Sequence, residues 1–389
     1  MLPIRKLALM LIASTLILTS LTIAAPVTQI TNNYTTKDNK IFLNEKEIKL
    51  KGVSWFGSEV RGDYMPHGLW SRNYKDMITQ IKQTGFNAIR FPFCPNTLKS
   101  LPVGYFDTDL NPSLVGKNSL QIMDIMLQEI NDQGMYILLD HHRPDCDTIS
   151  ELWYTNTYSE RSWIADLSLV VRRYKRLPML MGIEIKNEPH GASTWSNSRP
   201  TTDFNKAAER AGKTLLRFNP NILIYVGGIA NNPECDTPMV KWWGGNLAPV
   251  RCFPIINKYI PENKLVFSPH VYGPDVSDQP YFVAGQLKNT LPPIWENHFA
   301  GLSTKFTIVP TEFGGFYKKG SLDVEWQNTI IDYFIDKRIC NTFYWSWNPN
   351  SSDTGGILED DWNTIDTRKL NNLKRLHTAC NTNETPIKL

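Results

Sequence analysis

The chain has 389 residues, of which 41% are hydrophobic and 20% are charged, an ordinary composition for a soluble globular protein. Its 41 Lys and Arg nearly balance its 38 Asp and Glu, with a formal net charge of +3 and no dense basic block. Nucleic acid or an anionic membrane is therefore not indicated as a partner. The length suits two small domains or one α/β barrel.

The first 25 residues have the pattern of a secretory signal peptide. Arg5 and Lys6 form a short basic region, and Leu7–Ile23 is largely apolar before the small residues Ala24 and Ala25. A membrane anchor is the alternative, because the apolar stretch approaches spanning length. The Ala pair and the polar run that follows favour cleavage. We therefore predict a secreted, extracellular protein with no stable membrane association after cleavage.

Beyond the signal, residues 26–39 are rich in Thr and Asn and predict a loose N-terminal arm, and Lys40–Leu50 predicts a small hairpin that turns near Asn44 and Glu45. From Lys51 onward, short apolar runs alternate with amphipathic stretches. The runs predict strands at Lys51–Gly57, Ala88–Phe93, Tyr136–His142, Leu180–Asn187, Ile222–Gly227, Leu265–Tyr272, Thr307–Phe313 and Thr342–Trp347. The stretches between them predict helices that include Tyr74–Gln83, Leu120–Asp132, Arg161–Tyr174, Asp203–Phe218 and Val324–Asp336.

Eight strands that alternate with helices, each strand apolar on both faces, predict an α/β fold consisting of a single (β/α)8 TIM barrel with a short N-terminal hairpin. An open doubly wound sheet is the alternative, but no Gly-x-Gly-x-x-Gly loop follows any strand. We expect the barrel to occupy residues 40–380 and a C-terminal tail to occupy 381–389. Because no Ser/Thr/Pro linker follows the last helix, we expect one domain. We also expect the protein to be a monomer.

Six cysteines in an exported chain predict disulfides, although the sequence permits 15 pairings. Cys235 and Cys252 flank one compact loop, and Cys94 and Cys146 both lie just past consecutive strands. The favoured third pair joins the two cysteines that remain, Cys340 and Cys380. Without any Cys-x-x-Cys spacing, a zinc site built on cysteine is not expected.

The predicted strands end in a concentration of ionisable and aromatic residues. In such barrels the active site forms at the carboxyl ends of the strands, so these residues should converge. They are Arg90, Asp140, His141, His142, Asn187, Glu188, His190, His270, Tyr272, Glu312, Trp345 and Trp347.

Several of these residues lie in stretches that resemble glycoside hydrolase family 5, the cellulase family A, and especially its bacterial endoglucanases. The resemblance covers roughly residues 51–366, in the order that an eight-stranded barrel requires. It rests on Ala88-Ile89-Arg90-Phe91-Pro92, Leu139-Asp140-His141-His142-Arg143-Pro144-Asp145-Cys146, Ile185-Lys186-Asn187-Glu188-Pro189, Trp242-Trp243-Gly244-Gly245-Asn246-Leu247, Thr311-Glu312-Phe313-Gly314, Trp345-Ser346-Trp347-Asn348-Pro349 and Asp353-Thr354-Gly355-Gly356-Ile357-Leu358.

The resemblance implies that Glu188 is the catalytic acid/base and Glu312 the catalytic nucleophile. A retaining glycosidase needs two carboxyl groups about 5–5.5 Å apart, one protonated and one ionised. The alternative for two glutamates at strand ends is a rim ion pair, a common fate of exposed carboxylates.

Further substrate-binding residues are implied around this pair. Arg90 is expected to keep Glu312 ionised, and Tyr272 to donate a hydrogen bond to the same carboxylate. Asn187 is expected to bind the sugar 2-hydroxyl. His142, which pairs with Asp140, and His270, which shares a strand face with Tyr272, are also expected to bind substrate. Trp345 is expected to be a stacking platform for the sugar. At least one of Trp242 and Trp243 is expected to stack on sugar, with core packing as the alternative.

Neither a cofactor nor a catalytic metal is expected. His141, His142 and Asp145 resemble part of a metal cluster but lack a further well-spaced ligand. Glu184 and Lys186 share a strand face with Glu188, lie deeper in the barrel, and are expected to be a hydrogen-bonded structural pair.

The predicted function is that of a retaining endo-1,4-β-glucanase that hydrolyses internal bonds of cellulose or soluble β-glucans. The same mechanism on mannan, xyloglucan or mixed-linkage glucan is the first alternative. The second is a non-catalytic carbohydrate-binding protein, which the retention of both glutamates, Glu188 and Glu312, disfavours.

Overall fold

Parallel strands form the centre of the structure, a computed structural model that describes residues 32–230 and 242–381. They are hydrogen-bonded in the order β10-β9-β8-β7-β6-β5-β4-β11, and each neighbouring pair is parallel. Their bounds are β4 (Lys51–Ser54), β5 (Ala88–Phe93), β6 (Tyr136–His141), β7 (Leu180–Glu184), β8 (Leu223–Val226), β9 (Leu265–Phe267), β10 (Thr307–Ile308) and β11 (Thr342–Tyr344).

The two end strands of this sheet meet through the segment that follows β10. The backbone N–H of Phe343 donates to the carbonyl of Pro310 at 2.9 Å, and that of Trp345 donates to the carbonyl of Phe313 at 2.9 Å. These bonds close the sheet, and the predicted (β/α)8 barrel is confirmed. Most strands end earlier than predicted; β9, for example, stops at Phe267 rather than at Tyr272. Beyond that point the ladder is reduced to an isolated bridge between His270 and Glu312.

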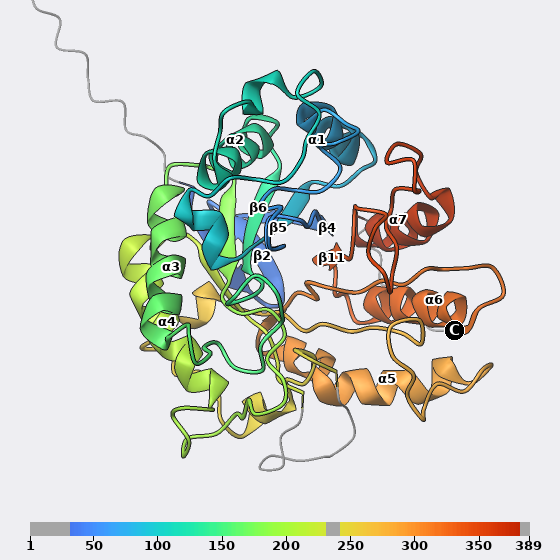
Figure 1. The fold of residues 1–389 in the computed structure, drawn as a ribbon. Helices are drawn as coiled ribbons and strands as arrows, with labels where there is room; N and C mark the ends of the chain where they lie inside the picture. Colours follow the sequence, from blue (N-terminus) through green and yellow to red (C-terminus); the bar gives the residue numbers. More distant parts are fainter. Residues whose placement is uncertain (1–31, 231–241, 382–389) are drawn as a thin grey trace, which may run out of the picture. The chain divides into compact units, whose positions relative to one another are not determined.

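Helices lie outside the strands (Figure 1). The five helices predicted by name are present within two residues of their expected bounds, because each carries one apolar stripe that packs on the barrel. Asn118 and Gln121 form a reciprocal capping box at the start of α2. The bounds are α1 (Tyr74–Gln83), α2 (Ser119–Asp132), α3 (Glu160–Arg173), α4 (Phe204–Phe218), α5 (Leu287–His298), α6 (Leu322–Asp336) and α7 (Thr367–Asn381).

One helix, α5, contains two consecutive prolines, Pro292 and Pro293. Proline inside a helix removes a backbone donor and clashes with the preceding turn, so the sequence rules predict a break there. The helix nevertheless continues, because Leu291, Ile294 and Trp295 are buried in the core on its inner face. The described part of the connection between β8 and β9 holds 3-10 turns, η3 (Ala248–Arg251) and η4 (Glu262–Lys264), in place of a full helix.

The N-terminal segment corrects one prediction. A loose arm is expected over residues 26–39, but β1 (Tyr34–Lys37) pairs antiparallel with β2 (Lys40–Leu43), which pairs in turn with β3 (Lys46–Ile48) as the predicted hairpin. Tyr34 explains the extra strand. Its side chain is buried, and its hydroxyl donates to the carbonyl of Pro178 at 2.8 Å. Its ring belongs to a cluster of buried apolar residues that also includes side chains of the barrel strands.

The predicted signal peptide, residues 1–25, and residues 382–389 of the predicted tail lie outside the described residues. Among the residues that the structure describes, no helix is long and apolar enough to cross a bilayer.

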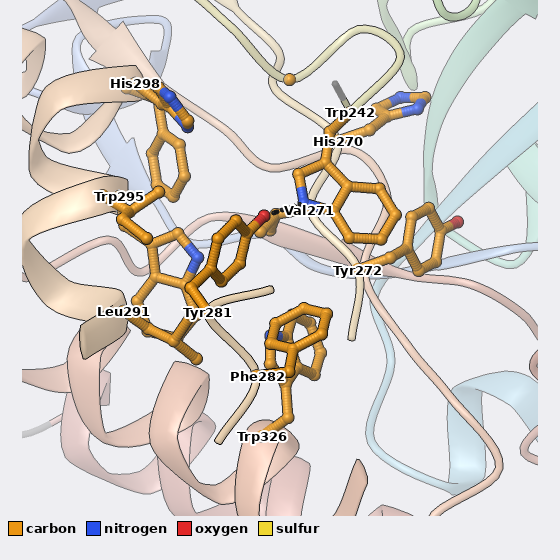
Figure 2. A pocket seen from close by; sticks show the side chains of 13 residues that line it. Trp242, His270, Val271, Tyr272, Tyr281, Phe282, Leu291, Trp295, His298 and Trp326 are labelled. Carbon is orange, nitrogen blue, oxygen red and sulfur yellow. Dashed lines mark hydrogen bonds between the residues drawn. The ribbon is translucent and has the colours of Figure 1, made fainter. Parts of the chain in front are cut away.

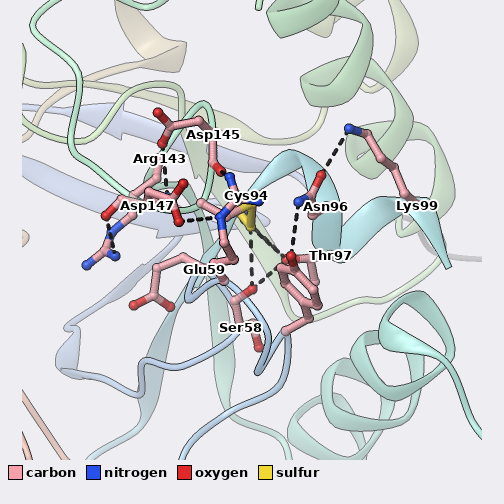
Figure 3. The surroundings of a disulfide bond; sticks show 12 residues. Ser58, Glu59, Cys94, Asn96, Thr97, Lys99, Arg143, Asp145 and Asp147 are labelled. Atoms are coloured by element: carbon pink, nitrogen blue, oxygen red, sulfur yellow. Dashed lines mark hydrogen bonds and ion pairs between the residues drawn. A yellow bond between two sulfur atoms is a disulfide. The ribbon is translucent and has the colours of Figure 1, made fainter. Parts of the chain in front are cut away.

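Two predicted disulfides are confirmed, Cys94–Cys146 and Cys340–Cys380. The partner predicted for Cys252, Cys235, lies outside the described ranges. Figure 3 shows the surroundings of the first disulfide, which ties together the loops after β5 and β6. The loop after β4 is attached to the same place, because the Thr97 hydroxyl donates to the carbonyl of Ser58 at 2.5 Å.

The second disulfide ties the start of β11 to the end of α7, and its cysteines are 40 positions apart in the sequence. Replacing both cysteines, Cys340→Ser with Cys380→Ser, should lower the free energy of unfolding by about 2–4 kcal/mol, because the unfolded chain gains conformational freedom. Urea unfolding followed by tryptophan fluorescence measures this difference. Under a reducing agent the wild type loses the same crosslink, so the gap should shrink; equal stability under oxidising conditions would contradict the prediction.

Candidate active site

An open cleft of about 990 Å³ lies at the carboxyl ends of the strands. Its walls come from loops that follow most of the barrel strands, which is why its residues are scattered through the sequence. Eight of the ten predicted site residues line it, and the other two, Arg90 and His270, lie buried behind them in contact with Glu312. The eight are His142, Asn187, Glu188, Trp242, Trp243, Tyr272, Glu312 and Trp345.

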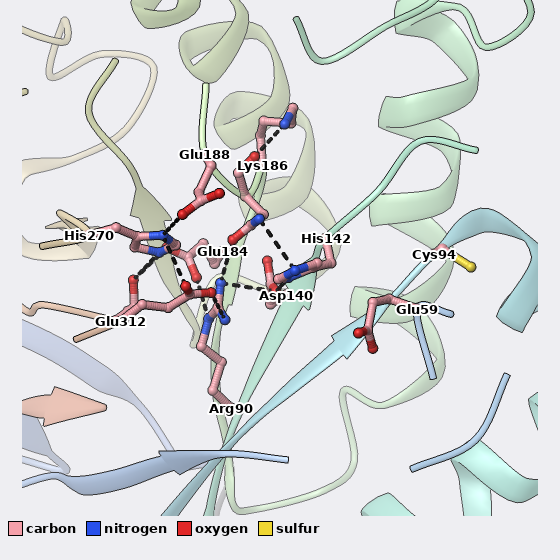
Figure 4. A network of polar contacts seen from close by, with 12 residues as sticks. Glu59, Arg90, Cys94, Asp140, His142, Glu184, Lys186, Glu188, His270 and Glu312 are labelled. Atoms are coloured by element: carbon pink, nitrogen blue, oxygen red, sulfur yellow. Dashed lines mark hydrogen bonds and ion pairs between the residues drawn. The ribbon is translucent and has the colours of Figure 1, made fainter. Parts of the chain in front are cut away.

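Two carboxyl groups face each other in this cleft (Figure 4). Glu188 follows β7 and Glu312 follows β10, and one oxygen of each lies within 4.8 Å of the other and of a ring nitrogen of His270. Glu188 adopts a left-handed backbone conformation with φ of 50°, which turns its side chain off the strand direction. The backbone of Gly244 packs directly against it, because a Cβ on Gly244 would lie 3.1 Å from the Cα of Glu188.

Beneath the pair, the fully buried Arg90 binds several acceptors at once. Its Nε donates to Glu184 at 2.7 Å, Nη1 to Glu312 at 2.5 Å, and Nη2 to the Asn187 side-chain oxygen at 2.9 Å. Asp140 lies 3.0 Å from Nη2. The planar guanidinium therefore fixes four side chains from different strand ends in one geometry.

Glu312 accepts hydrogen bonds from two donors, Arg90 at 2.5 Å and the Tyr272 hydroxyl at 2.5 Å. His270 lies 3.4 Å from the second carboxylate oxygen. Burial raises the pKa of Glu312 to about 7, against the opposing charges of His270 and Arg90. The two hydrogen bonds to Glu312 are the contacts predicted for Arg90 and Tyr272. The pKa of about 7 places the titration of this carboxyl near neutrality.

His270 lies between the two carboxyls. Its Nδ1 is 3.1 Å from Glu188, and its Nε2 is 3.1 Å from the Thr311 hydroxyl, which donates in turn to Glu184 at 2.7 Å. Burial alone lowers the pKa of His270, but the surrounding carboxylates, Glu312 foremost, raise it to about 10. For Glu188 the directions are opposite. Burial raises the pKa of Glu188, but the hydrogen bond and charge of His270 lower it by more, so it lies below its ordinary value.

His142 orients the Asn187 amide. Its Nδ1 is 2.6 Å from Asp140, and burial holds the pKa of the ring well below its usual value. A neutral ring with Nδ1–H bonded to Asp140 leaves Nε2 as an acceptor, and the Asn187 amide nitrogen lies 3.4 Å from it. The Asn187 oxygen accepts from Arg90, and Asn187 is among the residues that line the cleft.

Trp345 forms the floor of the cleft. Its indole stacks nearly parallel to Phe56, with centroids 5.2 Å apart and planes at 9°, and to His142, at 5.5 Å and 11°. Its Nε1–H donates to the Ser351 hydroxyl at 3.1 Å. The result is a fixed aromatic surface suited to a flat, partly apolar ligand.

On the side of Glu188, Trp242 and Trp243 form a second aromatic wall. Trp243 is 47% exposed and stacks on His190, with centroids 3.7 Å apart. The Trp242 ring lies 6.5 Å from that of Tyr272, and both rings line the cleft.

The predicted Glu184–Lys186 pair is wrong. Glu184 binds Arg90 and Thr311, and Lys186 donates to the backbone oxygen of Asn187. The reason is that β7 ends at Glu184, so the alternation that places residues 184 and 186 on one face no longer holds.

Two groups of residues could be considered for a metal ion. His141 does not join His142, since its Nε2 faces the Tyr158 hydroxyl at 3.1 Å. Glu188, His270 and Glu312 present ligand atoms within 4.8 Å of one another. The carboxylates around His270 raise its pKa to about 10, which favours the imidazolium, a form that donates to these carboxylates.

Among the cleft residues that sequence reasoning missed are Phe56 and the buried Glu59. Both follow β4, the strand whose end supplied no residue to the predicted site. The signal available in the sequence was the carboxylate of Glu59 two positions after a strand-terminal glycine, Gly57, whose N–H it accepts at 2.8 Å.

Comparison with known proteins gives a consistent result. The family model described as Cellulase (glycosyl hydrolase family 5) matches residues 43–351. The "Major extracellular endoglucanase" of Xanthomonas campestris pv. campestris is 50% identical over 341 residues, which are 87% of this chain and 69% of that protein. The "Endoglucanase" of Paenibacillus polymyxa is 40% identical over 360 residues, 91% and 89% of the two chains.

Solved structures agree with these relatives. The catalytic domain of the Xanthomonas enzyme superposes with a TM-score of 0.85 at 47% identity, covering 89% of this chain and 99% of that one. A complex of the endocellulase of Pyrococcus horikoshii with cellotetraose superposes with a TM-score of 0.85 at 42% identity, covering 90% and 99%.

The raised pKa of His270 predicts a pH-dependent stability. A base that binds its proton more tightly in the folded state contributes stability that is complete below the unfolded pKa, about 6.5, and is lost as the pH rises through the folded value, about 10. Wild type should therefore exceed His270→Asn in free energy of unfolding most at pH 6, and the difference should shrink toward pH 10. Urea unfolding across this range tests it; a difference that does not change with pH would refute the assignment.

Proposed function

Since this chain belongs to glycosyl hydrolase family 5 and is a retaining endo-1,4-β-glucanase, we propose that Glu188 is its general acid/base and Glu312 its nucleophile. The observation that carries the proposal is the placement of one oxygen of each carboxyl within 4.8 Å of the other. Retaining enzymes need this close spacing, because an inverting enzyme must leave room for a water molecule between carboxyl and sugar.

The two carboxyls divide the reaction into two displacements. In the first, a Glu312 oxygen bonds to the anomeric carbon while the glycosidic bond breaks and Glu188 gives its proton to the leaving oxygen. In the second, Glu188 takes a proton from water, the water oxygen bonds to the anomeric carbon, and the bond to Glu312 breaks. The configuration at that carbon is inverted twice and thus retained.

The first displacement needs the proton on Glu188 and the charge on Glu312. In the substrate-free site, burial raises the pKa of Glu312 and His270 lowers that of Glu188, so the two carboxyls and His270 titrate together. Positive charge develops at the anomeric carbon beside Glu312 in the transition state and favours the Glu312 carboxylate. The glycosidic oxygen gives the Glu188 proton an acceptor, and Arg90 and Tyr272 already donate to Glu312.

Other predicted residues have roles consistent with their contacts. Trp345 carries the glucosyl unit at the cleavage point on its exposed face. Asn187, which lines the cleft, binds the 2-hydroxyl, a contact that strengthens in the transition state. The leaving group extends past Glu188, so Trp242 and Trp243 bind the sugars released with it.

The substrate is a β-glucan oligosaccharide or polysaccharide, and the enzyme acts as a monomer outside the cell. The relative in Xanthomonas is named an extracellular enzyme, and residues 1–25 have the pattern of a signal peptide. Endo action fits the form of the site, an open cleft with aromatic surfaces on both sides of the carboxyl pair rather than a closed pocket.

The carboxyl assignments predict distinct effects of two substitutions. Glu312→Ala should lower turnover by at least about 10⁴-fold on every substrate, since no glycosyl-enzyme can form. Glu188→Ala should slow both displacements, and azide should restore turnover on aryl cellobiosides with a good leaving group, because they need no acid and azide replaces the activated water. Reducing-sugar release from carboxymethylcellulose and aryl-cellobioside kinetics measure these effects.

Cellotetraose binding by Glu312→Ala, measured by calorimetry, is the folding control. Near-normal turnover by this variant would remove Glu312 from the role of nucleophile. Parallel assays on mixed-linkage glucan, xyloglucan and mannan define which backbone the cleft prefers. Activity confined to mannan or xyloglucan would keep the two roles and change the substrate.

The export proposal makes a separate prediction. Expressed in a bacterium with its full leader, the enzyme should accumulate outside the cytoplasm with a new N-terminus at residue 25 or 26, as cleavage near Ala24 or Ala25 requires. N-terminal sequencing of the exported protein gives the cleavage point. A membrane-bound protein that retains residues 1–25 would show instead that the leader is an anchor.

A further inference from the structure

Trp242 is shared between two spaces in the molecule. The catalytic cleft lies on one side of the Trp242 side chain, and a small cavity of about 10 Å³ lies on the other side, behind the cleft wall. Aromatic side chains line most of this cavity (Figure 2). Among the cavity residues are Tyr272, Tyr281, Phe282 and Trp326. The indole of Trp242 is therefore a partition, and whatever sets its orientation also sets the shape of the cleft beyond Glu188.

A single hydrogen bond described for this indole holds it from behind. Its Nε1–H donates to the Tyr281 hydroxyl oxygen at 2.9 Å, as the dashed line in Figure 2 shows. The ring also lies 6.5 Å from Tyr272 and 6.4 Å from Phe282, both inclined rather than stacked. A partly buried indole N–H needs an acceptor, and Tyr281 supplies it from the connection between β9 and α5, in which residues 276–280 line the cleft.

The turn that carries Trp242 does little to fix the ring by itself. Gly244 and Gly245 follow it, and they allow the backbone to pass against Glu188 and His270. A Cβ on Gly245 would lie 2.7 Å from the backbone oxygen of His270. The turn is thus placed by its backbone, while the rotation of the indole depends on what its N–H and ring meet on the far side.

Tyr281 is itself well anchored. It lies in the connection from β9 to α5, and its ring packs edge-on against Phe282 at 4.9 Å. Shortly after it, the N–H groups of Gly285 and Leu287 donate to the carboxylate of Glu325 in α6, at 2.8 and 3.2 Å. Burial raises the pKa of Tyr281 to about 12, so the hydroxyl is neutral at every pH at which the enzyme would be assayed.

We propose that Tyr281 is a positioning residue for the leaving-group side of the cleft. By accepting the Trp242 N–H it holds the indole in the rotation that presents a ring face to the β-glucan chain beyond the cleaved bond. The inference rests on the proposed function, in which Trp242 binds sugars on that side. It assigns a specificity-determining role to Tyr281, which holds Trp242 from behind the cleft wall and is not among the residues that line the cleft.

The test is Tyr281→Phe, which removes the acceptor and keeps the ring. For cellotetraose and cellopentaose, kcat/KM should fall about fivefold, the effect of one ordinary hydrogen bond, and the change should lie mainly in KM. Hydrolysis of dinitrophenyl β-cellobioside should be unchanged, since its leaving group carries no sugar. A merely structural role of Tyr281 would instead lower activity on both kinds of substrate together.

Tyr333→Phe is the matched control. It also removes a tyrosine hydroxyl, one that donates to Glu296 at 2.9 Å in the outer groove between α5 and α6. This variant should leave both kinds of substrate unaffected. Thermal unfolding of the two variants shows whether either loss reflects stability alone.

Trp242→Phe completes a double-mutant cycle. It should weaken oligosaccharide binding, and adding Tyr281→Phe should then have no further effect, because the N–H that Tyr281 holds is gone. Two outcomes would overturn the inference and leave the proposed function standing. In the first, the losses of oligosaccharide kcat/KM in the two single variants multiply in the double variant. In the second, Trp242→Phe lowers oligosaccharide kcat/KM while Tyr281→Phe leaves it unchanged. A silent Trp242→Phe would reject both the role of Trp242 and the inference built on it.

Discussion

The contact on which this active site depends is the set of hydrogen bonds made by the buried guanidinium of Arg90. One side chain binds Glu184, Glu312 and Asn187 and lies 3.0 Å from Asp140. Three carboxylates in a buried space would repel one another strongly, and each would be costly to keep ionised. A planar, permanently charged group with donors in several directions is suited to join them. Because its partners come from different strand ends, Arg90 also makes the catalytic geometry a property of the closed barrel.

His270 adds a second cation to the same network and lies between the two catalytic carboxyls. It contacts Glu188 at 3.1 Å and Glu312 at 3.4 Å, so the two carboxyls and the imidazolium titrate as one system. Such coupling is useful to a double displacement, in which Glu188 must act as an acid in one step and as a base in the next.

The cleft on either side of the carboxyl pair is built by a different principle, that of aromatic surfaces held by polar contacts at their edges. Trp345 is held by Ser351, Phe56 and His142, and Trp242 is held by Tyr281. Stacking on a ring face is tolerant of position along a flat sugar, so its precision must come from whatever fixes the ring. The loops that supply these holders are tied down in turn, by the Cys94–Cys146 disulfide near Ser58 and by Glu325 of α6, which accepts from the backbone N–H groups of Gly285 and Leu287.

The sequence by itself determined the barrel and the convergence of polar residues at one end of it, because a (β/α)8 pattern is periodic and places strand-terminal residues together. The resemblance to glycoside hydrolase family 5 singled out the two glutamates, and the positions of the cysteines favoured the two disulfides that are present. The sequence also indicated the Asp140–His142 contact. It did not determine where each strand ends, since β7 stops at Glu184 and so separates Glu184 from Lys186, nor that α5 continues through Pro292 and Pro293 or that Tyr34 extends the hairpin. Those outcomes depend on burial and on partners far away in the sequence. Only the tertiary structure could show that Arg90 also holds Glu184, that His270 lies between the two carboxyls and that Tyr281 holds Trp242, because a hydrogen bond between distant residues leaves no periodic trace in the chain.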